Sequence, residues 1–156
     1  MNILSASEVV LFAVKIEETG QYFYRTFAEK LESEAEKEIL NYLADEEAKH
    51  IKIFETMLKN VEKFEPSISY PDEYFAYLQA YADNIIFVQD TLEKEVLKIN
   101  NVKDAADFGI RRELDSILYY QEIKSLVPEK EKDLIDEIIK EERKHFLKLS
   151  SLKKEL

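Results

Sequence analysis

The sequence carries one arrangement of residues twice, once in each half of the chain. AVKIEETGQYFYR (13–25) aligns with GIRRELDSILYYQ (109–121), and EEAKH (46–50) aligns with EERKH (141–145). The alignment pairs Glu17 with Glu113, Gly20 with Ser116, Tyr24 with Tyr120, Glu47 with Glu142, and His50 with His145. The offset is 96 residues for the first match and 95 for the second, so both halves keep one layout. Such a repeat predicts a duplicated structural unit.

The scarcity of turn-forming residues indicates that this unit is helical. The chain has 2 Gly and 3 Pro in 156 residues, and 46% of its residues are hydrophobic. This composition fits one domain with a sizeable core. We therefore expect an all-α four-helix up-down bundle of two duplicated helical hairpins with a long crossover. The single domain is expected to span 1–156, with hairpins at about 5–62 and 101–154 and the crossover at about 63–100.

Capping residues and prolines delimit the expected helices. The first helix is expected to begin at Ser5 or Ser7, with Glu8 completing a capping box, and to end near Leu31. The second is expected to begin after Ser33 and to end near Val61. The third is expected to run from near Asn101 to about Val127, and Pro128 then opens the fourth. Short loops within each pair make the paired helices antiparallel neighbours. In the crossover, Pro66 and Pro71 precede the aromatic stretch YFAYLQAYADNIIFVQ (74–89), which predicts one or two further helices.

Charge and cysteine content exclude several classes of function. The formal net charge of −11 argues against nucleic acid or an anionic membrane as a partner, because both would be repelled. With zero Cys the chain forms no disulfide, thiolate metal site or iron–sulfur cluster. No apolar run long enough to span a membrane and no secretory leader is visible, so a cytoplasmic location is expected.

Polar residues interrupt the apolar stripe of each expected bundle helix. Helical periodicity places six of them in central turns of the stripes: Glu17, Glu47, His50, Glu113, Glu142 and His145. On the fourth helix, for example, Leu134, Ile138, Leu149 and Leu152 enclose the last two. Glu46 is one residue, about 100°, out of phase with this face.

Burial of these six residues would require that the negative charge of the four carboxylates be neutralised. Any one of them alone would more often be a solvated glutamate or a hydrogen-bonded structural histidine. Together, four unpaired buried carboxylates would cost several kcal/mol each and would repel one another. We expect no core Lys or Arg to pair them. Two divalent cations would neutralise the four carboxylates, so the sequence predicts a two-metal site. The ligand types suit Fe, Mn or Zn and do not decide among them.

The constellation resembles the ferritin-like di-iron carboxylate superfamily, in which two helices each supply a Glu and two others each supply Glu-x-x-His. The likeness is greatest to the ferritin-like domain of rubrerythrins. It rests on KIEETGQYFY, DEEAKH, RRELDSILYY and KEERKH, and it covers nearly the whole chain apart from the crossover. The resemblance implies that Glu17 and Glu113 are terminal carboxylates, that Glu47 and Glu142 bridge two metals, and that His50 and His145 each bind one metal.

Two tyrosines fit the same pattern. Tyr24 and Tyr120 lie seven residues, about two turns, beyond Glu17 and Glu113, so their hydroxyls could bond carboxylates across the bundle. The alternative is that both rings are ordinary aromatic core. Gly20 and Ser116 would leave room near the metals or allow close helix approach.

The resemblance leaves three functions open. The first is reduction of hydrogen peroxide or O₂ at a di-iron site. The second is iron handling by a ferroxidase, and the third is a structural module whose metals staple the bundle. Rubrerythrins usually carry a four-Cys rubredoxin module that this sequence lacks, so a separate electron-donor protein is implied. Peroxide-reducing rubrerythrins also tend to have a further Glu where this chain has Ile110.

Aromatic residues of the crossover predict self-association. They number more than one face of a short helix can bury, so we expect a homodimer that covers some of them: Tyr74, Phe75, Tyr77, Tyr81 and Phe87.

Overall fold

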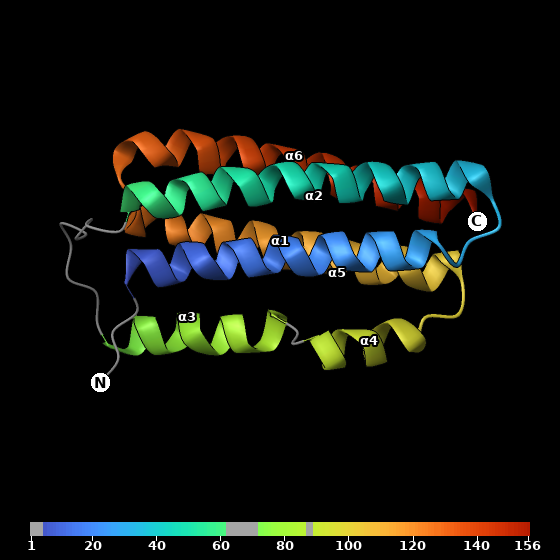
Figure 1. Ribbon diagram of the computed structural model, residues 1–156, viewed down its shortest axis with the longest axis horizontal. Helices are drawn as coiled ribbons and strands as arrows, with labels where there is room; N and C mark the ends of the chain where they lie inside the picture. Colours follow the sequence, from blue (N-terminus) through green and yellow to red (C-terminus); the bar gives the residue numbers. More distant parts are fainter. Residues whose placement is uncertain (1–4, 62–71, 87–88) are drawn as a thin grey trace.

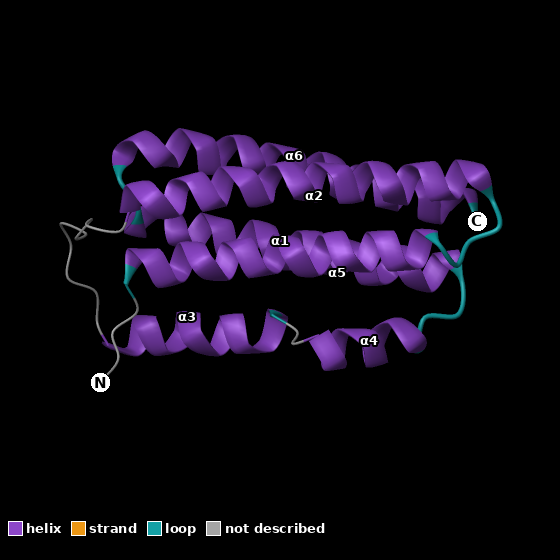
Figure 2. Cartoon of the chain, in the orientation of Figure 1, coloured by secondary structure: helices purple, strands orange, loops and turns teal. Residues whose placement is uncertain are grey.

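The chain folds as a four-helix bundle with two shorter helices along one side. In the computed structural model, residues 5–61, 72–86 and 89–156 are described. The bundle helices are α1 (Ala6–Ala28), α2 (Glu34–Val61), α5 (Val102–Ile123) and α6 (Glu129–Glu155), and the crossover helices are α3 (Asp72–Ile85) and α4 (Gln89–Leu97). Every regular element of the described residues is a helix, as Figure 2 shows, so the all-α fold expected from the sequence is confirmed.

The order of the helices makes two antiparallel pairs. α1 packs along α2, and α5 packs along α6. The crossover returns the chain along the bundle, so that α5 starts at the end of the bundle where α1 finishes (Figure 1). As a result α1 and α5, which carry the first sequence match, lie antiparallel and in contact, while α3 packs on α5 and α4 on α1.

The helix ends follow the predicted caps with small differences. Ser5 and Glu8 form the expected capping box, and Asn101 caps α5 by accepting a hydrogen bond from the Asp104 backbone N–H. α1 ends at Ala28 rather than near Leu31, because the backbone there tightens into bonds three residues apart. α5 ends at Ile123 and a 3₁₀ turn, Lys124–Leu126, replaces its predicted last turn.

The crossover forms two helices, in agreement with the one or two that the sequence predicted. α3 ends at Ile85, and α4 starts at Gln89. Three of the aromatic residues assigned to a dimer surface, Tyr74, Phe75 and Tyr81, are half-buried against the bundle core of the same chain, whereas Tyr77 is 44% exposed. Phe87, Pro66 and Pro71 lie outside the described residues.

The hydrophobic core is divided into two clusters. One contains Val10, Phe54 and Ile138, and the other contains Phe23, Leu43 and Leu149. The six predicted ligand residues lie between the two clusters in sequence on every bundle helix. On α6 the stripe begins with Ile135, not with Leu134 as predicted: Leu134 is 43% exposed, whereas Ile135 packs in the same cluster as Leu126.

Within the three described segments, no helix combines the length and the apolar composition that crossing a bilayer requires.

Candidate metal centre

Six buried side chains from the four bundle helices converge midway along the bundle. Glu17 comes from α1, Glu47 and His50 from α2, Glu113 from α5, and Glu142 and His145 from α6; each is 1–3% exposed. Their ligand atoms form two sets, within each of which all atoms lie within 4.8 Å of one another. The first ligand set is Glu17, Glu47, His50 and Glu142, and the second ligand set is Glu47, Glu113, Glu142 and His145.

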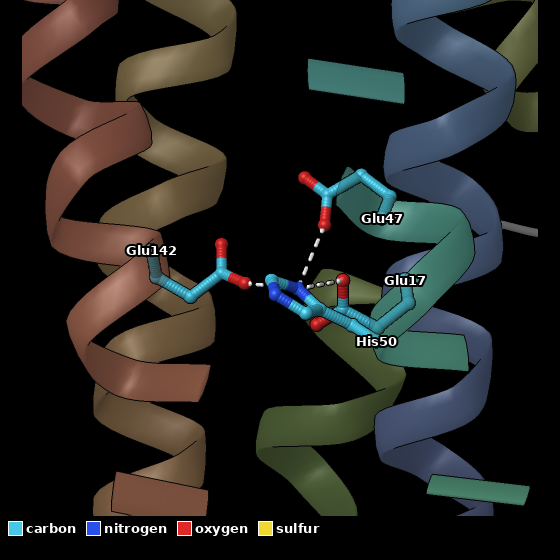
Figure 3. Close-up of side chains that lie close together, drawn as sticks. All are labelled: Glu17, Glu47, His50 and Glu142. Atoms are coloured by element: carbon cyan, nitrogen blue, oxygen red, sulfur yellow. Dashed lines mark hydrogen bonds and ion pairs between the residues drawn. The ribbon is translucent and has the colours of Figure 1, made fainter. Parts of the chain in front are cut away.

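The first ligand set surrounds the imidazole of His50 (Figure 3). His50 Nδ1 lies 2.7 Å from Glu142 Oε1 and 3.3 Å from both Glu17 Oε2 and Glu47 Oε2. Glu47 and His50 are three residues apart on α2, so they share one face of the helix, while Glu17 and Glu142 reach them from α1 and α6. Three carboxylate oxygens from three helices thus point at one ring nitrogen.

The second ligand set repeats this arrangement around His145. His145 Nδ1 lies 3.5 Å from Glu142 Oε2 and 3.7 Å from both Glu47 Oε1 and Glu113 Oε2. The rings of His50 and His145 have their centroids 5.7 Å apart. Glu47 and Glu142 each direct one oxygen to each histidine, which is the geometry that a carboxylate bridging two ions requires.

Each tyrosine of the repeat bonds the glutamate of the other half. The hydroxyl of Tyr24 donates to Glu113 Oε1, and that of Tyr120 donates to Glu17 Oε1. Because α1 and α5 are antiparallel and keep the same seven-residue spacing, each tyrosine lies level with the opposite carboxylate. Burial, followed by the neighbouring carboxylate, raises the pKa of both hydroxyls well above the usual range. Both therefore remain hydrogen-bond donors.

When no cation is bound, the carboxyl groups of Glu47 and Glu142, which belong to both ligand sets, carry protons instead. Burial raises the pKa of Glu47 well above its usual value, and the charges of Glu142 and Glu17 raise it further. Burial likewise raises the pKa of Glu142, with added repulsion from Glu17 and Glu113. Both groups are therefore neutral near pH 7 when no cation is bound.

The other four groups form two ion pairs. Burial alone would raise the pKa of Glu17, but contacts with Glu47, His50 and Tyr120 lower it to about 2. The pKa of Glu113 is lowered in the same way, against burial, by Glu142, His145 and Tyr24. Burial opposes the charged form of the imidazoles, yet the surrounding carboxylates raise the pKa of both histidines. The centre is then neutral, with four protons standing where two divalent cations would carry the same charge.

Protons alone leave the centre incompletely bonded. Among the described residues, neither ring nitrogen of His145 has a hydrogen-bond partner, and neither does Glu47 Oε2. Glu142 Oε1 lies near His50 but lacks hydrogen-bond geometry. Orphaned buried polar atoms cost about 1–3 kcal/mol each. Four carboxylates and two imidazoles with such orphaned atoms fit the donor set of a two-metal site.

One cation lies closer to the centre than the sequence predicted. The sequence predicted no core Lys or Arg that would pair the carboxylates, and it did not foresee Arg112, a core arginine that is 8% exposed. Its Nη2 donates to the carbonyl oxygen of Ile16 at 2.7 Å, and a Cβ placed on Gly20 would lie 3.5 Å from both this nitrogen and Glu47 Oε1. Arg112 precedes a stripe position, and only the reach of its long side chain buries the guanidinium. Within the described part of the chain, no ion pair joins it to a ligand carboxylate.

Two further positions differ from what periodicity suggested. Glu46 is buried although it is out of phase, but it belongs to neither ligand set and pairs with Lys49 at 2.5 Å. Gly109 has a packing role that the repeat did not reveal: a Cβ there would lie 2.9 Å from Leu149 Cδ1 and 3.2 Å from the Tyr24 hydroxyl. The absence of a side chain at Gly109 lets Tyr24 reach Glu113.

Comparison with known proteins agrees with the fold and the donor set. A family model described as rubrerythrin matches residues 8–153. Among solved structures, a Thermotoga maritima protein assigned provisionally to the ferritin-like diiron-carboxylate proteins superposes with a TM-score of 0.73. The two sequences are 26% identical, and the match covers 99% of this chain and 98% of the other. No curated protein matches the chain.

Proposed function

The chain belongs to the rubrerythrin family, and from this premise we propose that it reduces hydrogen peroxide or O₂ at a di-iron centre. Glu17, Glu47, His50 and Glu142 would hold one ion, and Glu47, Glu113, Glu142 and His145 the other. When bound, the iron pair would supply the two electrons that reduce peroxide to water. The single observation that carries the proposal is that Glu47 and Glu142 belong to both ligand sets.

The remaining residues of the centre would orient the ligands and exclude water. Tyr24 and Tyr120 each hold one oxygen of a terminal carboxylate, leaving the other oxygen directed at a histidine. The apolar clusters on either side keep the centre at 1–3% exposure. A low-dielectric site with fixed donors favours a reaction in which charge is redistributed between ligands and substrate.

Protons for peroxide reduction would reach the filled centre from solvent, because Glu47 and Glu142 lose theirs when the cations bind. Reduction of peroxide to two waters consumes two protons. In the absence of cations, Glu47 and Glu142 hold protons at their carboxyl oxygens, and they are displaced when the site is filled. The phenolic hydroxyls of Tyr24 and Tyr120 keep their protons and donate hydrogen bonds to the ligand carboxylates, which holds those oxygens in place.

The partners in this proposal are peroxide or O₂ and an electron donor. The chain has zero Cys, so an iron–sulfur or rubredoxin-type centre on a separate protein would supply the electrons. We place the reaction in the cytoplasm, as the sequence predicted. Manganese or zinc would fit the same ligands but would not carry the proposed iron chemistry.

Anaerobic titration of the Fe(II)-loaded protein with peroxide tests the proposal. We expect about one peroxide to be consumed per two Fe(II), with growth of the near-ultraviolet absorbance of oxidised iron. Glu47→Gln should abolish the change, whereas the matched control Glu46→Gln, which alters a neighbouring group outside the ligand sets, should retain it. A structural staple would show no absorbance change. A ferroxidase would continue to oxidise added Fe(II) well beyond the two ions bound per chain.

A further inference from the structure

A row of four tyrosine rings runs from the surface of α3 to the metal centre. The four, termed here the tyrosine row, are Tyr77, Tyr81, Tyr119 and Tyr120. Successive ring centroids lie 6.1, 5.7 and 6.1 Å apart. Tyr77 is 44% exposed at the outer end, while Tyr119 and Tyr120 are fully buried. The row ends where the Tyr120 hydroxyl donates to Glu17 Oε1.

The hydrogen-bond partner of each hydroxyl decides whether that tyrosine can lose a proton. Tyr120 and Tyr81 can, whereas Tyr119 cannot. An oxidised phenol is a strong acid, so a tyrosine loses an electron readily only where a base can take its proton. Tyr120 has the carboxylate of Glu17. Tyr81 donates to the carbonyl oxygen of Asp115 at 2.5 Å in an exposed position, where water can take the proton. Tyr119 donates to the buried carbonyl oxygen of Val9 at 2.9 Å, and a peptide carbonyl is too weak a base.

Tyr119 nevertheless joins the other two rings. Its ring is stacked on that of Tyr81 at an interplanar angle of 16° and meets Tyr120 edge-on at 71°. Its π system therefore offers electronic coupling between two tyrosines that can be oxidised. The chain has no Trp and no Cys, so tyrosines are its most readily oxidised aromatic or thiol groups.

We propose that the tyrosine row is an electron path, in which electrons pass from Tyr81 to Tyr120 through the ring of Tyr119. The proposal rests on the proposed function, because peroxide is the oxidant that draws the electrons. Tyr120 gives up one electron toward the centre and passes its phenolic proton to Glu17. An electron from Tyr81 then restores Tyr120, which takes the proton back, while Tyr81 releases its own proton to water.

The result of this transfer is a radical on Tyr81 rather than beside the ligands. There a reductant too large to enter the bundle can supply one electron, and water returns the proton. Two such transfers would return to the centre the two electrons that one peroxide takes from it. The row would protect Glu17 and its neighbours from oxidation whenever the electron donor is slow.

A single attached photo-oxidant can test the path. Ala80 is an exposed residue of α3 beside Tyr81. Because the chain has no native Cys, the variant Ala80→Cys would have a single thiol, to which one ruthenium tris-bipyridine group can be attached. The protein would be loaded with Zn²⁺, which has no redox chemistry, so the outcome is independent of peroxide reduction. Because the oxidant is now at the outer end, the flash drives the path in reverse: we expect a radical on Tyr81, which then takes an electron from Tyr120 through Tyr119, so that part of the radical population appears on Tyr120. That part would be identified by the electron paramagnetic resonance signal that Tyr120→Phe removes.

Two substitutions at the middle ring separate a path from ordinary packing. Tyr119→Phe keeps the ring and should leave the rate of radical arrival at Tyr120 within about threefold, whereas Tyr119→Leu removes the ring and should slow it at least about tenfold. Tyr81→Phe, which leaves the buried core unchanged, should lower the yield at Tyr120 by at least about tenfold and guards against misfolding of the leucine variant. Unchanged transfer in Tyr119→Leu or Tyr81→Phe would overturn the proposal. Equal slowing in Tyr119→Phe and Tyr119→Leu would overturn the assignment of Tyr119 as a bridge.

Discussion

At the scale of single residues, Glu142 is neutral without metal and would be a bridging anion with it. Its two oxygens face the two histidines, and burial with repulsion from Glu17 and Glu113 raises its pKa. A neutral carboxyl has the shape and hydrogen-bonding capacity of an amide. Glutamine at this position should therefore be tolerated by the metal-free fold and should fail only when metal must be bound.

We predict that Glu142→Gln reduces the metal content from two ions to fewer than one per chain. The melting temperature of the metal-free variant at pH 7.5 should stay within a few degrees of the parent, measured by circular dichroism. The control is Glu141→Gln, which removes a partly exposed carboxylate paired with Lys144 at 2.8 Å and should keep both ions. A fall of roughly 10 °C or more in metal-free Glu142→Gln would correspond to several kcal/mol and would mean that Glu142 is a structural residue.

At the scale of helices, the two glycines of the chain occupy mid-helix positions with different surroundings. A Cβ at Gly20 would make only ordinary contacts at 3.5 Å, whereas one at Gly109 would lie 2.9 Å from Leu149 on α6 and 3.2 Å from the Tyr24 hydroxyl. Gly109 thus allows α5 to approach both α1 and α6 closely.

We predict opposite effects for the two alanine substitutions. Gly20→Ala should raise the free energy of unfolding by about 0.5–1 kcal/mol, because alanine favours the helix. Gly109→Ala should lower it by about 1–3 kcal/mol through overpacking, and should displace Tyr24 from Glu113. Chemical denaturation measures both. Equal stabilisation by the two substitutions would show that α5 has room to shift, and that Gly109 does not set its position.

The repeat and the helical phase predicted the elements and the grouping of the ligands because both follow from local spacing. A residue in the middle of a 3.6-residue stripe must face the core, so Glu17 and Glu113 could be placed from the sequence alone. Arg112 could not, because its Cα lies off the stripe and only its length carries the guanidinium inward. The sequence also could not show that Ile135, and not Leu134, begins the buried stripe of α6, because this depends on how α6 starts after the 3₁₀ turn.

At the scale of the whole molecule, the protons of the centre make metal-free stability dependent on pH. Glu47, Glu142 and both histidines have a raised pKa, so the folded chain keeps protons that the unfolded chain releases above about pH 4.5 and pH 6.5, respectively. Glu17 and Glu113 have a lowered pKa, and their contribution is lost as pH falls below about 4.5. The two effects together place the metal-free stability maximum near pH 5.

We therefore predict that the melting temperature of the metal-free protein falls between pH 5 and pH 8, and that metal-loaded protein does not share this fall. Metal binding near neutral pH should release about four protons per two ions, as measured in weakly buffered solution. A metal-free melting temperature that rises over this pH range would show that the four groups are not protonated in the folded state.

The predicted homodimer concerns the outer surface of the molecule. Half-burial of Tyr74, Phe75 and Tyr81 within the chain reduces the aromatic area that remains for a partner, but Tyr77 stays 44% exposed. Sedimentation at micromolar concentration should give the mass of two chains. Tyr77→Lys should shift this equilibrium toward the monomer, and sedimentation of the parent chain as a monomer would contradict the prediction.

The central claim is that two ions share the carboxylates of Glu47 and Glu142. Anomalous diffraction from crystals of Fe(II)-loaded protein, collected at the iron absorption edge, tests it most directly. We expect two anomalous peaks per chain, one bound by Glu17 and His50 and the other by Glu113 and His145. Oxygens of both shared carboxylates should lie about 2.0–2.2 Å from each peak, the distance range known for the same ligand atoms on zinc. A single peak, or two peaks of which one lacks Glu47 and Glu142 as ligands, would contradict the account.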